Sequence, residues 1–354
     1  MWQREEIAQS RTMKTAGTRA LLALALCGLL LPRVTQAEQR PLFDLRGHRT
    51  AVLQVVFDPK RPALASIGHD RKILVWNLER HTLARRIAPV GRSAAAGGSL
   101  LAVPRTIEGI GFLPNGELGE LAVEGGVGTV RLWNTLNGSE IRTIASDDRG
   151  SRALAFSPDG AIVATTAADG SQFNQKIILR NVSDGRVLHE LRSARLSATR
   201  LTFSPDGALL LSAGGKRMNL WNVADGTMLH QIGTHKKTIQ AITFAPDGKS
   251  FASAGDGDLI RIWNPTSGTL LRDFEAEQDG VNALAYSPDG GRLASAGDDW
   301  TTRIWNPETK KLLKRLRGHT ERVLTVAYSP DGKFLATGSR DTTISIWSVA
   351  DFEK

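Results

Sequence analysis

Histidine, a hydroxyl residue, aspartate and tryptophan recur together in this sequence at a fixed spacing. Counted from the histidine, the hydroxyl residue follows by 18 positions, the aspartate by 22 and the tryptophan by 28. Two sets are complete, namely His48, Ser66, Asp70 and Trp76, and His319, Thr337, Asp341 and Trp347. Serine, histidine and aspartate form the hydrolase triad, in which the hydroxyl is the nucleophile. Because a hydrolase needs one such set and this pattern occurs twice, we do not expect it to be catalytic.

Other residues offer little for metal or cofactor chemistry. The seven histidines are scattered, and no group of His, Asp and Glu has the spacing of a metal site. No glycine-rich phosphate loop opens a helix, because the sequence predicts no helices. Four aspartates in neighbouring units leave a cation site open as an alternative: Asp256, Asp258, Asp298 and Asp299. We expect no cofactor and no metal site, and no enzyme.

A strict period positions these residues along the chain. Tryptophan in an Ile-Trp or Leu-Trp pair recurs at 221, 263, 305 and 347, a constant step of 42 residues. Between these tryptophans, short runs of alternating apolar and polar residues are bounded by Gly, Pro, Asp and Ser, which is typical of antiparallel strands. Turns such as Ser329-Pro-Asp-Gly recur in the middle of the units and predict hairpins. A period of this length indicates a repeat protein.

The last unit, Arg315 to Val349, resembles the WD-repeat family of β-propellers. The resemblance lies in Gly318-His319, the turn at Ser329, Thr337, Asp341 and Trp347, although the family's Trp-Asp pair is Trp347-Ser348 here. It extends over nearly the whole chain after residue 40. It implies an all-β fold for 38–354, a seven-bladed β-propeller of four-stranded antiparallel blades. The seven expected repeats end at Trp76, Trp133, Arg180, Trp221, Trp263, Trp305 and Trp347.

The resemblance also implies how the ring closes. In this family the repeat and the blade are offset by one strand, so residues 41–46 should supply the outer strand of the seventh blade. The His, Ser/Thr, Asp and Trp sets become hydrogen-bond networks inside the blades, and the two complete sets flank this closure. The fifth unit has Gly257 at the aspartate position, and the sixth keeps Ser295 and Asp299 but lacks the histidine.

Propellers of this family mostly bind proteins or peptides on the rim around the narrow end of the channel. The aligned rim positions are Ala51, Leu53, His69, Thr106, Glu108, Gly150, Arg152, Ser197, Thr199, Thr238, Gln240, Asp256, Gly280, Asn282, Asp298, Arg322, Leu324 and Arg340. Trp300 follows Asp299 in a tight turn, and an exposed tryptophan beside arginines is typical of a binding hot spot. We expect partner-binding residues at Trp300, Asp298, Arg322 and Arg340, with Arg152 and Phe173 across the channel, and at Gln240 and Asp256. The alternative is that Trp300 lies flat over its own blade.

Two insertions interrupt the period, at 87–106 and at 169–176. Loops carry function more often than frameworks do, so each is either a relaxed insertion or a functional loop. The residues by themselves do not decide between these two interpretations.

The first 37 residues predict a secretory signal peptide. From Met13, the expected true start, Lys14 and Arg19 precede an apolar run from Ala20 to Leu31, and small residues follow before a cut. An uncleaved anchor and a lipoprotein signal at Cys27, the only cysteine, are the alternatives. Removal of 1–37 would lower the net charge from +9 to +6, because five Lys/Arg and two Asp/Glu leave with it.

These observations favour a non-enzymatic scaffold of the bacterial cell envelope, periplasmic or secreted and monomeric, that binds protein or peptide partners. No stable membrane span is expected after cleavage. The charge lacks the dense basic stripe of a nucleic-acid-binding protein. The alternative is a periplasmic propeller enzyme or ligand-binding or cation-binding protein of the lactonase-like or quinoprotein-like type. A translocation-associated periplasmic propeller fits less well, because the strands end on Ile-Trp.

Overall fold

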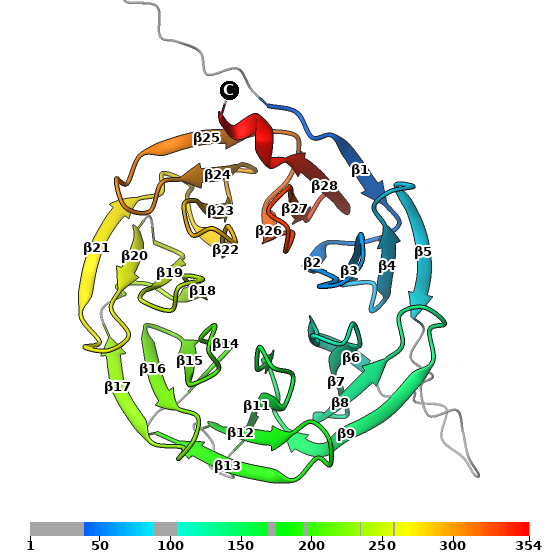
Figure 1. The fold of residues 1–354 in the computed structure, drawn as a ribbon, viewed down its shortest axis with the longest axis vertical. Helices are drawn as coiled ribbons and strands as arrows, with labels where there is room; N and C mark the ends of the chain where they lie inside the picture. Colours follow the sequence, from blue (N-terminus) through cyan, green and yellow to red (C-terminus); the bar gives the residue numbers. More distant parts are fainter. Residues whose placement is uncertain are drawn as a thin grey trace, which may run out of the picture. The chain divides into compact units, whose positions relative to one another are not determined.

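The computed structural model describes residues 39–87, 105–168, 175–193, 197–233, 235–257 and 259–353, all of which belong to one compact unit. This unit is a ring of seven antiparallel sheets of four strands each (Figure 1). The predicted seven-bladed propeller is therefore confirmed. The predicted signal peptide, the inserted residues 88–104 and 169–174, Phe173 and Asp258 lie outside the described residues.

Each blade is built from four strands that follow one another from the channel to the outer edge. Blades one to three comprise β2 (Val52–Phe57), β3 (Ala63–Gly68), β4 (Ile73–Asn77) and β5 (Thr82–Ile87); β6 (Arg105–Phe112), β7 (Leu118–Glu124), β8 (Val127–Trp133) and β9 (Glu140–Arg149); and β10 (Leu154–Phe156), β11 (Ile162–Ala168), β12 (Gln175–Asn181) and β13 (Val187–Arg192). Blades four to six comprise β14 (Arg200–Phe203), β15 (Leu209–Gly214), β16 (Arg217–Asn222) and β17 (Met228–Gly233); β18 (Ile239–Phe244), β19 (Phe251–Gly255), β20 (Leu259–Trp263) and β21 (Leu270–Glu275); and β22 (Val281–Tyr286), β23 (Leu293–Gly297), β24 (Thr302–Trp305) and β25 (Leu312–Leu316).

The seventh blade combines the two ends of the propeller. Its strands are β26 (Val323–Tyr328), β27 (Phe334–Ser339), β28 (Thr343–Ser348) and, on the outside, β1 (Phe43–Arg46). Strand β1 runs antiparallel to β28, with Phe43 opposite Ile346 and Arg46 opposite Thr343. The predicted closure by 41–46 is confirmed. A single 3-10 turn, η1 (Val349–Glu353), follows β28, and no α-helix occurs in the described ranges.

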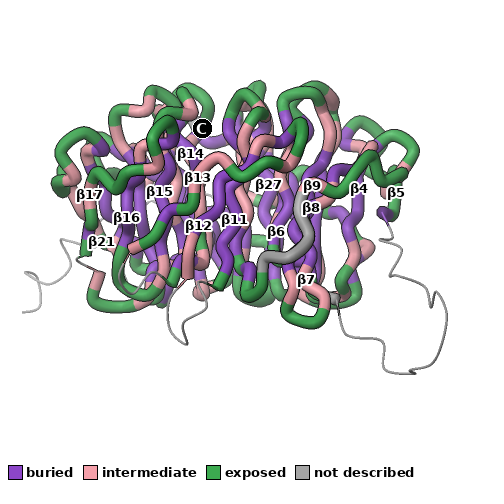
Figure 2. The backbone as a smooth tube through the Cα atoms, turned by 90° about the horizontal axis from the view of Figure 1, so that it is seen from below, coloured by how far each residue is buried: buried purple, intermediate pink, exposed green. Residues whose placement is uncertain are grey.

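Seven apolar clusters hold the ring together, and each joins two neighbouring blades. The cluster at the closure combines Leu45, Ile344 and Ile346 of blade seven with Val52 and Trp76 of blade one. In the side view the buried residues run along the blades, and exposed residues cover the loops at both ends (Figure 2). A four-stranded sheet that is apolar on both faces cannot cover itself, so stacking around a ring buries each face against a neighbour.

Candidate partner-binding surface

One end of the central channel is a cavity of about 440 Å³ to which all seven blades contribute. One predicted rim residue from each blade lines it, and these are Leu53, Glu108, Arg152, Thr199, Gln240, Asn282 and Leu324. The opposite ends of the innermost strands, near Pro246, Pro288 and Pro330, line a second cavity of about 390 Å³. The sequence alignment therefore assigned these seven positions to the same end of the channel.

A β-bulge in the innermost strand carries the channel side chain in five blades. The pairing register skips Leu53, Glu108, Gln240, Asn282 and Leu324, each of which is the extra residue of its strand. An extra residue leaves the ladder and redirects its side chain, so bulges are common beside functional sites. Here they direct one side chain from each of these five blades toward the channel.

Trp300 stands on the same end of blade six, and the residue is 54 % exposed. Its backbone φ is 67°, and the residues in the corresponding turns of blades one and seven, Arg71 and Thr342, have similar values of 61° and 76°. A non-glycine residue pays a conformational cost in this left-handed region. Neither burial nor backbone preference therefore explains a tryptophan at this position.

The acidic and basic residues predicted around Trp300 fall into one group across blades six and seven. Asp298 forms an ion pair with Arg322 at 3.2 Å, and the backbone of Arg340 donates to the carbonyl of Arg322 at 2.9 Å. The guanidinium of Arg340 lies 3.7 Å from the carboxylate of Glu321. Both arginines are exposed, so their pairing with carboxylates is weak and leaves them available to a partner. We call Asp298, Trp300, Arg322 and Arg340 the Trp300 patch.

Asn282 connects the Trp300 patch to the channel. Its amide donates to Asp298 at 2.8 Å and to the carbonyl of Val323 at 3.0 Å. On blade five, Gln240 donates in the same way to Asp256 at 3.1 Å. Arg152 lies in the channel wall on blade three, across the ring from blades six and seven (Figure 1).

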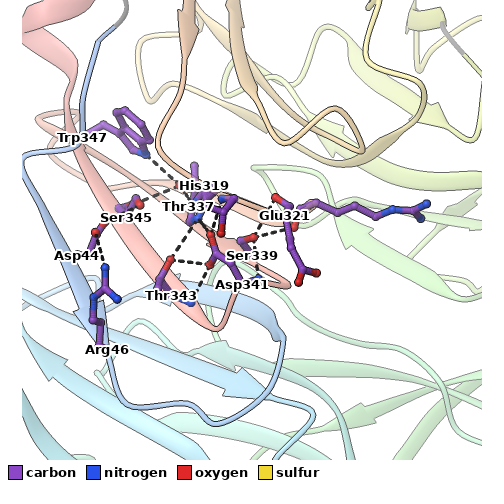
Figure 3. A network of polar contacts seen from close by, with 12 residues as sticks. Asp44, Arg46, His319, Glu321, Thr337, Ser339, Asp341, Thr343, Ser345 and Trp347 are labelled. Carbon is purple, nitrogen blue, oxygen red and sulfur yellow. Dashed lines mark hydrogen bonds and ion pairs between the residues drawn. The ribbon is translucent and has the colours of Figure 1, made fainter.

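The two complete sets of His, Ser/Thr, Asp and Trp are hydrogen-bond networks within blades one and seven. In blade seven, His319 Nδ1 lies 2.9 Å from Asp341 and Nε2 lies 2.8 Å from Thr337, whose hydroxyl accepts the Trp347 indole N–H at 2.9 Å (Figure 3). Blade one repeats this arrangement with distances of 2.9, 2.8 and 2.8 Å, through His48, Asp70, Ser66 and Trp76. The hydroxyls are fully buried between ring systems, so they cannot attack an external substrate.

In blade one the pKa shifts agree with a neutral histidine beside an ionised aspartate, because the pKa values of His48 and Asp70 are both lowered. Burial lowers the pKa of His48, and this outweighs the opposing effect of the Asp70 hydrogen bond and charge. Burial by itself would raise the pKa of Asp341, but hydrogen bonds from His319 and Thr343 and the backbone N–H of Thr320 hold it well below its usual range. The Thr337 and Ser66 hydroxyls accept the indole N–H, and with both assigned as donors to Nε2 the histidine carries a proton on Nδ1, facing the aspartate.

Blades two and six complete their interiors with residues that the sequence did not single out. In blade six, the Ser295 hydroxyl donates to the side chain of Gln278, whose amide donates to the Thr301 carbonyl at 3.0 Å. Gln278 stands one position after the expected histidine site. In blade two, the buried carboxylate of Glu120 accepts the Trp133 indole N–H at 2.8 Å. In blade two the sequence did offer a signal for Glu120, because the indole N–H of a buried tryptophan such as Trp133 needs an acceptor.

The described members of the alternative cation site, Asp256, Asp298 and Asp299, are each bound to other side chains. Asp299 binds Arg303 at 3.1 Å and the Thr301 hydroxyl at 2.8 Å, while Asp298 and Asp256 are engaged as described above. Across the described ranges, no group of three or more His, Cys, Asp or Glu is arranged to hold a metal ion. Asp258, the remaining member of the predicted cation site, lies outside these ranges.

Comparison with known proteins gives matches to the family described as "WD domain, G-beta repeat" at residues 39–77, 138–171, 185–222, 226–264, 268–306 and 310–348. Blade two is the blade whose strands lie mostly outside these segments. The chain is 26% identical to the B-type cell cycle switch protein ccs52B of Medicago truncatula, over 50% of this chain and 33% of that protein.

Two further relatives show the same level of similarity. The WD repeat-containing protein VIP3 of Arabidopsis thaliana is 28% identical over 48% of this chain and 50% of its own length. The WD repeat-containing protein 90 of Mus musculus is 26% identical over 50% of this chain and 9% of its own length. The chain thus matches half or less of each relative.

Proposed function

Because this chain belongs to the WD-repeat family, whose propellers generally serve as protein-interaction scaffolds, we propose that it is a non-enzymatic scaffold that binds a protein or peptide on the Trp300 patch and the adjoining channel end. The observation that carries this proposal is the exposed Trp300 in a left-handed turn, beside the Asp298–Arg322 ion pair. An exposed aromatic side chain on the same end of the ring as exposed arginines supplies the apolar contact and the directed hydrogen bonds that dominate protein interfaces.

The channel end would add specificity to this contact. Its seven blade-specific side chains include one acid, Glu108, and one base, Arg152, next to amides and leucines. A partner loop that enters the cavity would meet hydrogen-bonding side chains from five blades and leucines from two. Electrostatic steering would be modest, because the arginines of the patch are partly paired with Asp298 and Glu321.

We further propose that the scaffold works in the bacterial cell envelope as a monomer, exported by the leader predicted at 1–37. In the described part of the chain, no helix is both long and apolar enough to cross a bilayer. Cell fractionation, together with mass spectrometry of the mature N-terminus, tests the export. Light scattering of the purified protein tests the monomer.

Crosslinking in an envelope extract, followed by mass spectrometry, tests the binding site. We expect wild type to capture a partner, and Trp300→Ala to reduce its yield at least about tenfold, as loss of a hot-spot residue of about 2 kcal/mol implies. The matched control is Leu136→Ala, which removes an exposed apolar side chain from the end of β8 on blade two. Equal capture by wild type and Trp300→Ala would show that partners bind elsewhere.

A further inference from the structure

A cavity of about 270 Å³ opens in blade five at the position where blades one and seven hold the aspartate of their networks. Its lining consists of His235, Lys236, Lys237, Gly257, Leu259, Arg261 and Glu275. Gly257 stands six positions before Trp263, as Asp341 does before Trp347. The cavity therefore coincides with a missing carboxylate.

The intact blades show what that carboxylate binds. In blade seven, Asp341 accepts the imidazole of His319 at 2.9 Å, the backbone N–H of Thr320 at 2.9 Å and the backbone N–H of Thr343 at 2.9 Å. In blade one, Asp70 accepts from the corresponding three groups at 2.9, 3.1 and 3.3 Å. Each carboxylate thus occupies a site with three fixed donors, one side chain and two backbone amides.

Blade five keeps the residues that carry these three donors. His235 matches His319, Lys236 matches Thr320 and Leu259 matches Thr343, and all three line the cavity. His235 Nε2 lies 2.7 Å from the Ser253 hydroxyl, which also accepts the Trp263 indole N–H at 2.8 Å. We assign the Ser253 hydroxyl as the donor to Nε2, as in the intact blades, which places the proton of the neutral imidazole on the second nitrogen, on the side of the cavity.

The glycine is not required by the packing or by the backbone. A Cβ added to Gly257 would meet nothing within 4 Å, and its φ lies outside the left-handed region. By contrast, a Cβ on Gly255, two residues earlier, would lie 1.9 Å from the Thr238 carbonyl oxygen. The surrounding space thus permits a side chain at position 257, and in its absence the cavity has room for a group from another molecule.

The cavity wall favours an anion. Lys236 and Lys237 are exposed at its mouth, Arg261 forms part of its wall, and Glu275 is the acidic residue of the lining. In blade six the residue that corresponds to Arg261 is Arg303, and it binds Asp299 at 3.1 Å, the aspartate that corresponds to Gly257. Burial, followed by the charge of Arg261, lowers the pKa of His235 to about 4, so the imidazole is a neutral donor at pH 7.

We propose that this cavity is a binding site for a carboxylate group, which takes the place of the aspartate that blade five lacks. The carboxylate comes either from a partner polypeptide, as an acidic side chain or a C-terminus, or from a small free organic acid. Both sources offer the same two oxygen acceptors to His235 and to the backbone amides of Lys236 and Leu259. The polypeptide source rests on the proposed scaffold function, whereas the site itself does not.

Titration of the full-length protein with sodium acetate at pH 7, against sodium chloride at equal ionic strength, tests the site. We expect saturable NMR shifts of the His235 ring in acetate and none in chloride. Gly257→Asp should fill the site within the chain and weaken acetate binding at least about tenfold, while Gly257→Ala should retain it. Absence of a saturable shift in wild type, or an equal response in Gly257→Asp, would overturn the proposal.

Asp258 follows Gly257 directly and carries a carboxylate of its own. A separate variant therefore tests whether this carboxylate, rather than an external one, occupies the site. If its carboxylate satisfies the three donors, wild type gives no acetate response and Asp258→Asn creates one, which would refute an external ligand. If the site is open, Asp258→Asn binds acetate as wild type does.

A second set of probes separates the sources. Acetylated Gly-Gly is compared with its C-terminal amide, and acetyl-aspartate amide with acetyl-asparagine amide, by the same His235 shifts. Tighter binding of either acid than of acetate indicates a polypeptide ligand, and binding no tighter than acetate indicates a small organic acid. Trp300→Ala should leave all of these titrations unchanged, so failure of the scaffold proposal and failure of this one can be told apart.

Discussion

Strand β1 is expected to contribute strongly to the stability of the whole ring through one side chain, Leu45. This residue is 2 % exposed and packs against the cluster that joins blades seven and one. Leu45→Ala removes its apolar contacts and leaves a cavity, which costs about 3 kcal/mol for a buried leucine. The backbone pairing of Leu45 with Ile344 is unaffected, so the loss measures the packing of the closure.

Leu42→Ala is the matched control, because the same substitution is made three residues earlier in the same segment. Leu42 is 51 % exposed, and its backbone N–H donates to the Ile346 carbonyl at 2.7 Å in either variant. We expect this control to lose less than about 1 kcal/mol. The comparison therefore separates burial at the closure from the mere presence of the strand.

Urea unfolding followed by tryptophan fluorescence gives the free energy of unfolding of each variant. For a propeller of this size, about 3 kcal/mol also corresponds to a fall in Tm of about 5 °C. Equal midpoints for Leu45→Ala and Leu42→Ala would refute the reasoning, since the closure would then lie outside the cooperative unit. A second, early transition in Leu45→Ala alone would show that the ring opens before it unfolds.

Two further predictions concern acid and glycine. Because the pKa of Asp341 is held below its unfolded value, its contribution to stability is complete above about pH 4 and is lost as the pH falls. Asp341→Asn should therefore be less stable than wild type at pH 7, and its free energy of unfolding should fall less steeply below pH 4. Urea unfolding at several pH values measures this, and parallel falls in the two proteins would contradict the prediction. Gly214→Ala should destabilise blade four by about 3 kcal/mol or prevent folding, because a Cβ there would lie 1.7 Å from the Ser197 carbonyl oxygen. Gly257→Ala is the control, because a Cβ at that position meets nothing within 4 Å. Equal thermal stability of the two variants would argue against the close approach at Gly214.

Much of this fold follows directly from the sequence. The period of 42 residues and the repeated turns predicted a repeat protein, and the resemblance to WD-repeat propellers implied seven blades and the pairing of 41–46 with the last strand. This prediction succeeds because each blade in a repeat protein contacts mainly its neighbours, so local pattern and nearest-neighbour packing specify the whole. Blade two lies mostly outside the family matches, and yet it forms the same four strands, because its apolar alternation is intact.

Sequence reasoning predicted only part of the candidate partner-binding surface. Alignment placed one residue of each blade at the channel, and composition singled out Trp300. Neither could show that Asp298 pairs with Arg322 across two blades, or that Gln278 turns inward one position after the expected histidine. These contacts depend on bulges and on rotamers that neighbouring blades impose, and a linear pattern does not record them.

The sequence, through its period and its resemblance to a known propeller family, thus determined the number of blades and implied their strand order and the closure, since these depend on periodic burial of apolar faces. It also showed that position 257 lacks an aspartate. Only the tertiary structure decided what that absence means, because the cavity there is formed by residues from before β18, within β20 and at the end of β21. Whether donors separated in sequence converge on one point is set by the packing of the finished blade.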